Sequence, residues 1–208
     1  MRLSVFIGLF LSVVLGIGAA AVSGQSVHSA TRNGGGGSGP LAIGVGISDY
    51  DVDFGKGRML GGTLWADYFP GFVPGPLRGI GMEMEARDIT LNRSSSQPSN
   101  LREETAGGGV IYAWPHFRKF HPYAKYTMSF GGIYFGLPSG VVQPHPYTHD
   151  TRTVTAYGGG IDYHAVGSLW VRGEYEYQHW PHLFGRSALN PQGVTVGAVY
   201  RFNAFHLR

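Results

Sequence analysis

Two histidines close to a serine are the residues of this chain that could support hydrolytic or acyl-transfer chemistry. His179 and His182 flank a Trp-Pro pair, and Ser187 follows them in the chain. A Ser-His-acid site needs the basic nitrogen within hydrogen-bond reach of the nucleophilic hydroxyl. Because this segment is expected to connect two strands, we predict that these are loop residues and that the chain has no catalytic site.

A second group of possible ligands surrounds two prolines. His145, His149 and Asp150 are nitrogen and oxygen donors close in sequence, with Pro144 and Pro146 on either side of the first. A metal site needs several donors that converge in a defined geometry, and the prolines leave the relative positions of these donors undefined. We therefore predict no metal site and regard these residues as part of a polar loop.

Glycine clusters could suggest a nucleotide site, but they lack its other residues. Gly107 to Gly109 and Gly158 to Gly160 are not followed by the Lys-Ser/Thr of a phosphate loop, and glycine in a strand marks a bend or a close approach. The formal net charge is +3 and no run of Lys or Arg occurs, so nucleic-acid binding is not expected. The chain has no cysteine, which excludes disulfides and thiolate metal sites. We predict no cofactor.

The composition indicates which elements must position these residues. Of 208 residues, 34 are glycine, 28 are aromatic (12 Tyr, 12 Phe, 4 Trp), and only 14% are charged. Glycine and aromatic residues are poor helix formers, and a disordered chain would lack the aromatics. The mixture favours many β-strands that curve and pack closely.

The N-terminal segment has the layout of an export signal. In residues 1–24 a positive start precedes an apolar stretch, Leu3 to Ile17, and a small-residue end. We predict a signal peptide here, with an uncleaved anchor over Leu3 to Val22 as the alternative, because that stretch approaches the roughly 20 residues of a spanning helix. Residues 25–40, which include Gly34 to Gly37, are predicted to form a flexible linker.

From Leu41 onward the sequence alternates with a period of two, as in half-buried strands. One face of each alternating segment is apolar, and the other carries small or charged residues. Eight such segments occur, an even number, which is typical of bacterial outer-membrane barrels. They span residues 41–48, 60–68, 80–87, 109–114, 124–131, 157–163, 169–178 and 194–202.

The charges on the minor faces bear on which face is buried. A membrane barrel turns its apolar face to lipid and keeps a polar lumen, whereas a soluble barrel does the reverse. Charges of both signs could pair inside a narrow lumen and so avoid the cost of an isolated buried charge. These residues are Asp67, Glu83, Glu85, Arg87, Lys125, Asp162, Arg172, Glu174, Glu176 and Arg201.

The connections and the aromatics favour the membrane barrel. With the N-terminus in the periplasm, the longer connections face outward, as in outer-membrane barrels. The first outward connection, Asp49 to Arg58, is only of moderate length. The second connection along the chain, Phe69 to Pro76, lies on the periplasmic side and is not especially short. The longest outward connections are Leu91 to Glu103, Gly136 to Asp150 and Trp180 to Pro191, against His164 to Ser168 on the other side. Aromatics that suit an interfacial belt are Tyr68, Trp114, Tyr126, Tyr157, Tyr163, Tyr175, Tyr177 and Tyr200.

The last segment carries a resemblance to a known family. Gly193 to Phe202 ends in phenylalanine, with Val196, Ala198 and Tyr200 at alternate positions before it. This resembles the C-terminal signature by which bacterial outer-membrane proteins are delivered to their assembly machinery. The segment from Tyr157 to Tyr177 is similar to the late strands of the OmpA-like and porin-like eight-stranded barrels, although the chain continues past the signature to Arg208.

The resemblance implies a stand-alone barrel without a peptidoglycan-binding domain, assembled by the barrel-assembly machinery. We predict an all-β protein in which residues 41–208 form an eight-stranded antiparallel up-and-down transmembrane β-barrel. It would be a monomer in the bacterial outer membrane, in contact with outer-membrane lipid. Because side chains fill an eight-stranded lumen, no wide pore is expected.

For function, we predict a non-enzymatic protein with a structural role or a surface-interaction role through its extracellular loops. Two alternatives stay open at this point. One is a lipid-modifying barrel of the lipid A deacylase type, although no His-x-Ser pair stands on a late strand as in that family. The other is a soluble periplasmic carrier that resembles a lipocalin.

Overall fold

The computed structural model describes residues 41–51, 53, 57–73, 75–91, 101–114, 116–134, 149–183 and 187–202. The predicted signal peptide (1–24), the predicted linker (25–40) and His145 lie outside these ranges. Within them the alternating segments form strands. The elements are β1 (Leu41–Asp51), β2 (Arg58–Tyr68), η1 (a 3-10 helix, Gly75–Gly79), β3 (Ile80–Leu91), β4 (Arg102–Ala113), β5 (Phe120–Tyr134), β6 (His149–Val166), β7 (Leu169–Leu183), β8 (Ser187–Leu189) and β9 (Gln192–Arg201).

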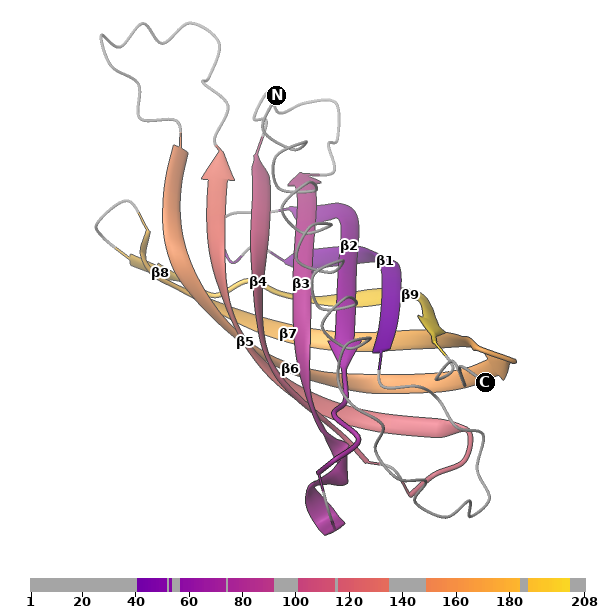
Figure 1. The fold of residues 1–208 in the computed structure, drawn as a ribbon. Coiled ribbons are helices and arrows are strands. Elements are labelled where there is room, and N and C mark those ends of the chain that lie inside the picture. Colours follow the sequence, from indigo (N-terminus) through magenta and orange to yellow (C-terminus); the bar gives the residue numbers. More distant parts are fainter. Residues whose placement is uncertain are drawn as a thin grey trace, which may run out of the picture. The chain divides into compact units, whose positions relative to one another are not determined.

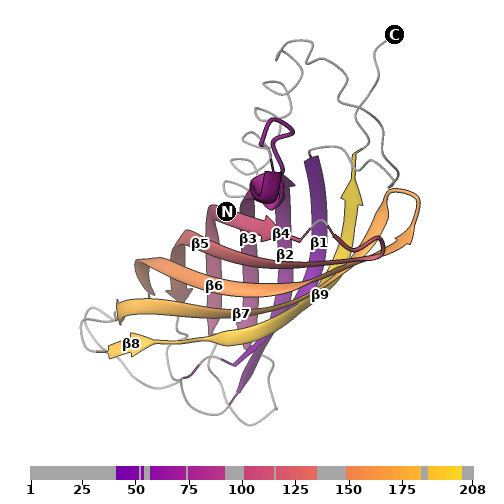
Figure 2. The ribbon, with the colours of Figure 1, turned by 90° about the horizontal axis from the view of Figure 1, so that it is seen from below.

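Eight of the strands close into an antiparallel up-and-down barrel (Figures 1 and 2). Each of β1 to β6 pairs with the next strand, β7 pairs with β9, and β9 pairs back with β1 from Ala42↔Arg201 to Asp51↔Gln192. The ninth strand, β8, pairs with β7 alone and falls in a segment predicted to be a connection. The predicted fold is therefore confirmed, with one short extra strand outside the barrel.

The strands alternate in direction between two ends of the barrel. We call the end where β1 begins the turn end; it carries connections 69–79, 114–119 and 167–168. The tightest of these is a two-residue turn in which Gly167 has a φ of 57°, a conformation that favours glycine. The opposite end, which we call the loop end, carries connections 52–57, 92–101, 135–148 and 184–191.

Several strands are longer at the loop end than the sequence pattern predicted. The fourth strand begins at Arg102 instead of residue 109, and β6 begins at His149 instead of residue 157 and spans 18 residues. Near these strand ends both faces carry polar residues; in β4, for example, Arg102 and Glu104 alternate with Glu103 and Thr105. The backbone stays extended there, but the alternation of apolar and polar residues on which the prediction rested is lost.

Side chains alternate between the lumen and the outer surface as predicted. Ser48 and Thr195 are 0% and 2% exposed, whereas their neighbours Ile47 and Val196 are 66% and 60% exposed. Small residues make room inside: a Cβ atom on Gly44 would collide with the indole of Trp65. The core of the molecule therefore lies within the lumen.

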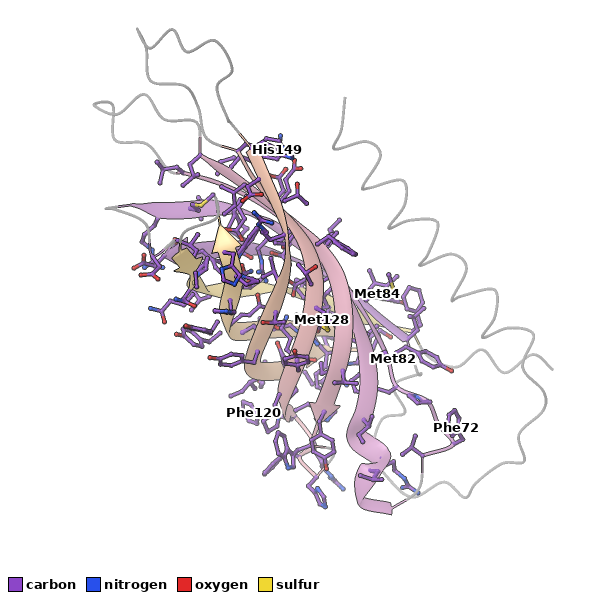
Figure 3. The ribbon with its side chains drawn as sticks, turned by 90° about the vertical axis from the view of Figure 1, so that its left-hand side faces the viewer. Phe72, Met82, Met84, Phe120, Met128 and His149 are labelled. Carbon is purple, nitrogen blue, oxygen red and sulfur yellow. The ribbon has the colours of Figure 1, made fainter. Side chains whose placement is uncertain are left out.

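The outer surface is an apolar and aromatic band around the barrel. Figure 3 shows part of it, with Phe72 and Phe120 toward the turn end and Met82 and Met128 above them. All eight aromatic side chains predicted for the lipid-facing side point outward. This arrangement is the reverse of a soluble barrel, so the carrier alternative is wrong. In the described part of the chain, no helix is long and apolar enough to cross a membrane.

Candidate functional site

Ten of the charged side chains that point into the lumen form ion pairs with one another across six strands, and we call them the lumen network. All ten were predicted from the sequence, and each is 8% exposed or less. They share the inward face because side chains two residues apart in a strand point the same way. The members are Asp67 (β2), Glu83, Glu85 and Arg87 (β3), Lys125 (β5), Asp162 (β6), Arg172, Glu174 and Glu176 (β7), and Arg201 (β9).

Lys125 lies at the centre of this network. Its Nζ is 2.9 Å from Glu83, 2.6 Å from Glu85, 2.8 Å from Glu174 and 2.9 Å from Glu176. One ammonium thus links β5 to β3 and β7. The carboxylate oxygens of Glu83, Glu85 and Glu174 lie within 4.8 Å of one another, a spacing that a cation could bridge. The lysine ammonium contacts all three and is the cation that bridges them.

Arg172 makes the most cross-lumen contacts on the turn-end side of Lys125. Its guanidinium donates to Asp67 at 2.6 Å, to Glu83 at 3.0 Å and to Asp162 at 2.7 Å. The same group lies over two aromatic rings, 4.5 Å from the ring centroid of Tyr123 and 5.1 Å from that of Trp65. A planar guanidinium suits both carboxylate and aromatic partners, so this side chain joins β7 to β2, β3, β5 and β6.

Two further arginines extend the network toward both ends. Arg87 donates to Glu176 at 2.7 Å and contacts Glu85 at 2.5 Å, on the loop-end side. Toward the turn end, Arg201 donates to Asp162 at 2.8 Å. The paired charges therefore occupy several successive levels of the lumen.

A ladder of hydroxyl groups continues from Arg87 around the wall. The Nε of Arg87 donates to Thr63 at 3.2 Å, and Ser48 lies 2.5 Å from the Thr63 hydroxyl and 2.7 Å from that of Thr195. These contacts join β3, β2, β1 and β9 on the lumen side. The partners of Ser48 are threonines, so the ladder contributes to barrel closure and contains no base that could activate a nucleophile.

Toward the loop end the interior changes from charged to apolar. A cluster that we call the apolar cap fills this part of the lumen; it comprises Tyr50, Met59, Ile89, Leu101, Ile133, Val154, Trp180 and Leu189. The sequence prediction missed it because the strands were expected to end earlier. The signal was present, since Tyr50 and Ile89 each lie two residues beyond an inward polar residue, Ser48 and Arg87.

A buried carboxylate, that of Glu103, lies inside this apolar region. Glu103 stands opposite Ile89 on β3 and Ile133 on β5, and it is 1% exposed. Among the described residues, neither of its carboxylate oxygens has a hydrogen-bond partner. An unpartnered buried carboxylate is costly, which sets Glu103 apart from the paired acids of the lumen network.

The candidate catalytic and metal-binding residues mostly lie in strands. His149 and Asp150 begin β6, and His179 and His182 belong to β7, so the prediction that they are loop residues was wrong. At this end of the barrel the strands continue beyond the alternating apolar pattern, so the pattern did not predict that these residues lie in strands. Ser187 lies in β8 instead of a loop.

The contacts of these histidines are local. The Nδ1 atom of His179 is 2.8 Å from the side-chain oxygen of Asn190, and the Nε2 atom of His149 is 3.0 Å from the Thr151 hydroxyl. His182 has a φ of 51° where the β7–β8 register is irregular. The structure therefore brings no described serine to the two histidines whose contacts are known.

The chain matches the family model of the outer membrane protein beta-barrel domain over residues 12–202. Among solved structures it is similar to neisserial surface protein A (NspA), with 11% identity, a TM-score of 0.58, and coverage of 78% of this chain and 96% of that one. It is also similar to Ail, the attachment invasion locus protein of Yersinia pestis, with 17% identity, a TM-score of 0.52 and the same coverage.

A further structure of Ail, in complex with the heparin analogue sucrose octasulfate, matches with 18% identity and a TM-score of 0.50, again over 78% of this chain and 96% of that one. At these identities the solved structures show a common fold. No curated protein matches the sequence.

Proposed function

This chain belongs to the outer membrane protein beta-barrel domain family and lies in a bacterial outer membrane, and from that premise we propose that it acts through its loop end. In this proposal the barrel is a non-enzymatic platform. The loop end faces the cell exterior, as the longer connections do in outer-membrane barrels, and it interacts there with surfaces or molecules outside the cell.

The observation that carries this proposal is the filled lumen. Lys125, Arg172 and Arg87 each hold carboxylates of other strands across the interior, and the apolar cap fills the lumen beyond them. A solute would have to break several of these buried ion pairs to pass. Transport through the lumen is therefore disfavoured, and the parts of the barrel that can meet a partner are its outer wall and its ends.

The length of the strands supports the same proposal. A tilted strand crosses a bilayer with about 9–11 residues, whereas β5 has 15 and β6 has 18. The β5–β6 pair continues toward the loop end beyond Thr155↔His179, the last β6–β7 pair in that direction, and reaches Tyr134↔His149. This hairpin stem would hold connection 135–148 away from the membrane surface.

A deletion experiment tests the proposal. Connections 92–100 and 135–148 would each be replaced by a short Gly-Ser turn that leaves Leu101 of the apolar cap in place, and adhesion of expressing cells to heparin-coated and to polystyrene surfaces would be measured. We expect adhesion to fall in the variants while unboiled protein still migrates differently from boiled protein on a gel, because the barrel stays closed. Unchanged adhesion on both surfaces would contradict a role for the loop end.

The filled lumen can be tested separately in planar bilayers. We expect no large, stable conductance from the wild-type protein, because the side chains of the lumen network and the apolar cap occupy the lumen. A steady nanosiemens-scale channel from a monomer would contradict the filled lumen and would favour a transport role.

A further inference from the structure

The turn end carries basic side chains without acidic partners. Arg78 in η1 and Arg118 and Lys119 in connection 114–119 are exposed. Connections 69–79, 114–119 and 167–168 contain no Asp or Glu. Within the described ranges, none of these three cations forms an ion pair with another residue. Their charges are therefore available to a partner outside the chain.

The described arginines of the loop end differ in this respect. Arg58 contacts Asp49 at 2.8 Å, Arg102 contacts Asp88 at 2.6 Å and Glu104 at 2.7 Å, and Arg152 contacts Asp150 at 3.2 Å. Each of these cations is already neutralised within the barrel. Basic side chains without an acidic partner are thus found at the turn end, whereas these arginines of the loop end are all paired.

The three turn-end cations share one sector of the rim. The end of η1 packs against the end of β4, since Ile80 pairs with Tyr112 and a Cβ atom on Gly79 would collide with the carbonyl group of Ala113. Connection 114–119 leaves β4 at the same place and leads into β5. Arg78 therefore lies on the connection next to the one that carries Arg118 and Lys119.

Exposed apolar and aromatic side chains lie on the same two connections as these cations, or directly after them. Phe72 is 80% exposed, Phe117 54%, Leu77 53%, Phe120 53% and Trp114 42%. Exposed aromatic rings beside basic side chains are typical of the boundary between acyl chains and headgroups, where the ring enters the apolar layer and the cation remains in the headgroup layer. Figure 3 shows Phe72 and Phe120 at this end of the barrel.

We propose that this sector of the turn end, made up of connection 69–79, connection 114–119 and Phe120, binds the headgroups of anionic phospholipids in the leaflet that surrounds it. The rings of Phe72, Phe117 and Trp114 insert beside the acyl chains and place Arg78, Arg118 and Lys119 at the level of the phosphates. Charge complementarity selects the lipid class, because the sector offers three cations and no acid. Each basic residue near an anionic surface strengthens binding by about 1 kcal/mol, or roughly fivefold.

Tryptophan fluorescence provides a specific readout of this site. All four tryptophans lie in the described ranges; Trp65, Trp170 and Trp180 are 2%, 6% and 0% exposed inside the barrel, and Trp114 is exposed on the outer surface. Trp114 is therefore the tryptophan that a quencher on a lipid chain can contact directly. The wild-type protein would be reconstituted with equal fractions of brominated phosphatidylglycerol or brominated phosphatidylcholine.

We expect the relative binding constant for phosphatidylglycerol over phosphatidylcholine to be at least about fivefold at low salt. It should fall toward one in 1 M salt, where screening acts over about 3 Å. The triple variant R78Q/R118Q/K119Q should lose the preference. The matched control R58Q/R102Q/R152Q removes three arginines from the loop end and should retain it.

Three outcomes would overturn the proposal: equal quenching by both lipids in the wild type, a preference that persists in the turn-end variant, or a preference that the loop-end control abolishes. Barrel closure of every variant would be checked by the migration of unboiled protein. If the triple variant failed to close, R118Q/K119Q alone would be measured, with a partial loss of preference expected and an unchanged preference counting against the proposal.

Discussion

The lumen network and the apolar cap occupy the same barrel and share strands β2, β3, β5, β6 and β7, yet the buried carboxylates in the two regions have opposite surroundings. In the network, Glu83, Glu85, Glu174 and Glu176 all contact the ammonium of Lys125. In the region of the cap, Glu103 is equally buried and has no hydrogen-bond partner among the described residues. We infer from this difference that the contribution of a buried carboxylate to stability depends on its counter-charge as well as on its burial.

The largest expected effect comes from removing the central cation. Lys125→Met leaves four glutamates without their shared partner, and breaking a buried charge pair in this way costs about 3–5 kcal/mol. The free energy of unfolding would be measured by urea titration in phospholipid vesicles, with Met128→Leu on the outer face of the same strand as the control. A loss of less than about 1 kcal/mol would mean that the network does not depend on its lysine.

Placing an arginine on the lipid-facing side of the barrel should cause the next largest loss in the free energy of unfolding. Val196 points outward and Thr195 points into the lumen, and Val196→Arg should cost about 2–4 kcal/mol because the guanidinium would lie in hydrocarbon. Thr195→Arg would enter the polar lumen, so its smaller penalty should come from steric crowding. Unfolding titrations of both variants would measure the difference.

Accessibility identifies the face directly, because the chain has no cysteine. A cysteine at position 196 should be shielded from water-soluble thiol reagents and reached by a quencher in the lipid phase. If the lipid-phase quencher reached position 195 instead, the inward and outward assignments would both be reversed.

Glu103 and Glu174 allow the most direct comparison between a buried carboxylate without a partner and one that is paired. Glu103→Met removes an unpartnered buried carboxylate and should raise the free energy of unfolding by roughly 1–3 kcal/mol. Glu174→Met removes a partner of Lys125 and of the Tyr123 hydroxyl, which donates to it at 2.6 Å, and should lower it. The same titration measures both variants, and an equal loss in the two would show that the counter-charge does not set the contribution of these carboxylates.

The smallest effect is expected at the exposed rim. Arg58 and Asp49 form a pair with side chains 56% and 39% exposed. Such pairs contribute about 0–1 kcal/mol and are screened by salt, so Arg58→Gln should hardly change the unfolding midpoint. A large loss at this position would show that ion pairs of the wall matter as much as those of the lumen.

The parts of the structure that the sequence predicted are those in which the two strand faces differ. Alternation placed Ile47 and Val196 outside and Ser48 and Thr195 inside, and it brought the ten charges of the lumen network to one interior. It failed where that contrast disappears. Around Glu103 both faces of β4 are polar, so the strand was expected to begin near residue 109.

The alternating pattern could not predict which charged residues contact each other, for a different reason. The sequence shows that Lys125 shares a face with acids, but which acids it meets depends on the stagger of β3, β5 and β7 around the barrel. That stagger adds up over successive pairs of neighbouring strands, such as Glu83↔Gly109 between β3 and β4 followed by Gly109↔Thr127 between β4 and β5. The turn-end cations raise the same difficulty, because Arg78 and Arg118 become neighbours through η1, a 3-10 helix that the alternating pattern does not predict.

The pairing of β1 with β9 has a consequence for how the molecule forms. This pairing joins residues near Leu41 to residues near Arg201, and the Ser48–Thr195 contact spans nearly the same separation. Contacts so distant in sequence make folding slow. Until β9 is in place, β1 and β7 each present an open edge, and unpaired edges promote association with other chains. A nascent barrel that lacks its last strand is therefore the state most exposed to aggregation, and ring closure by Gln192–Arg201 ends that exposure in one step.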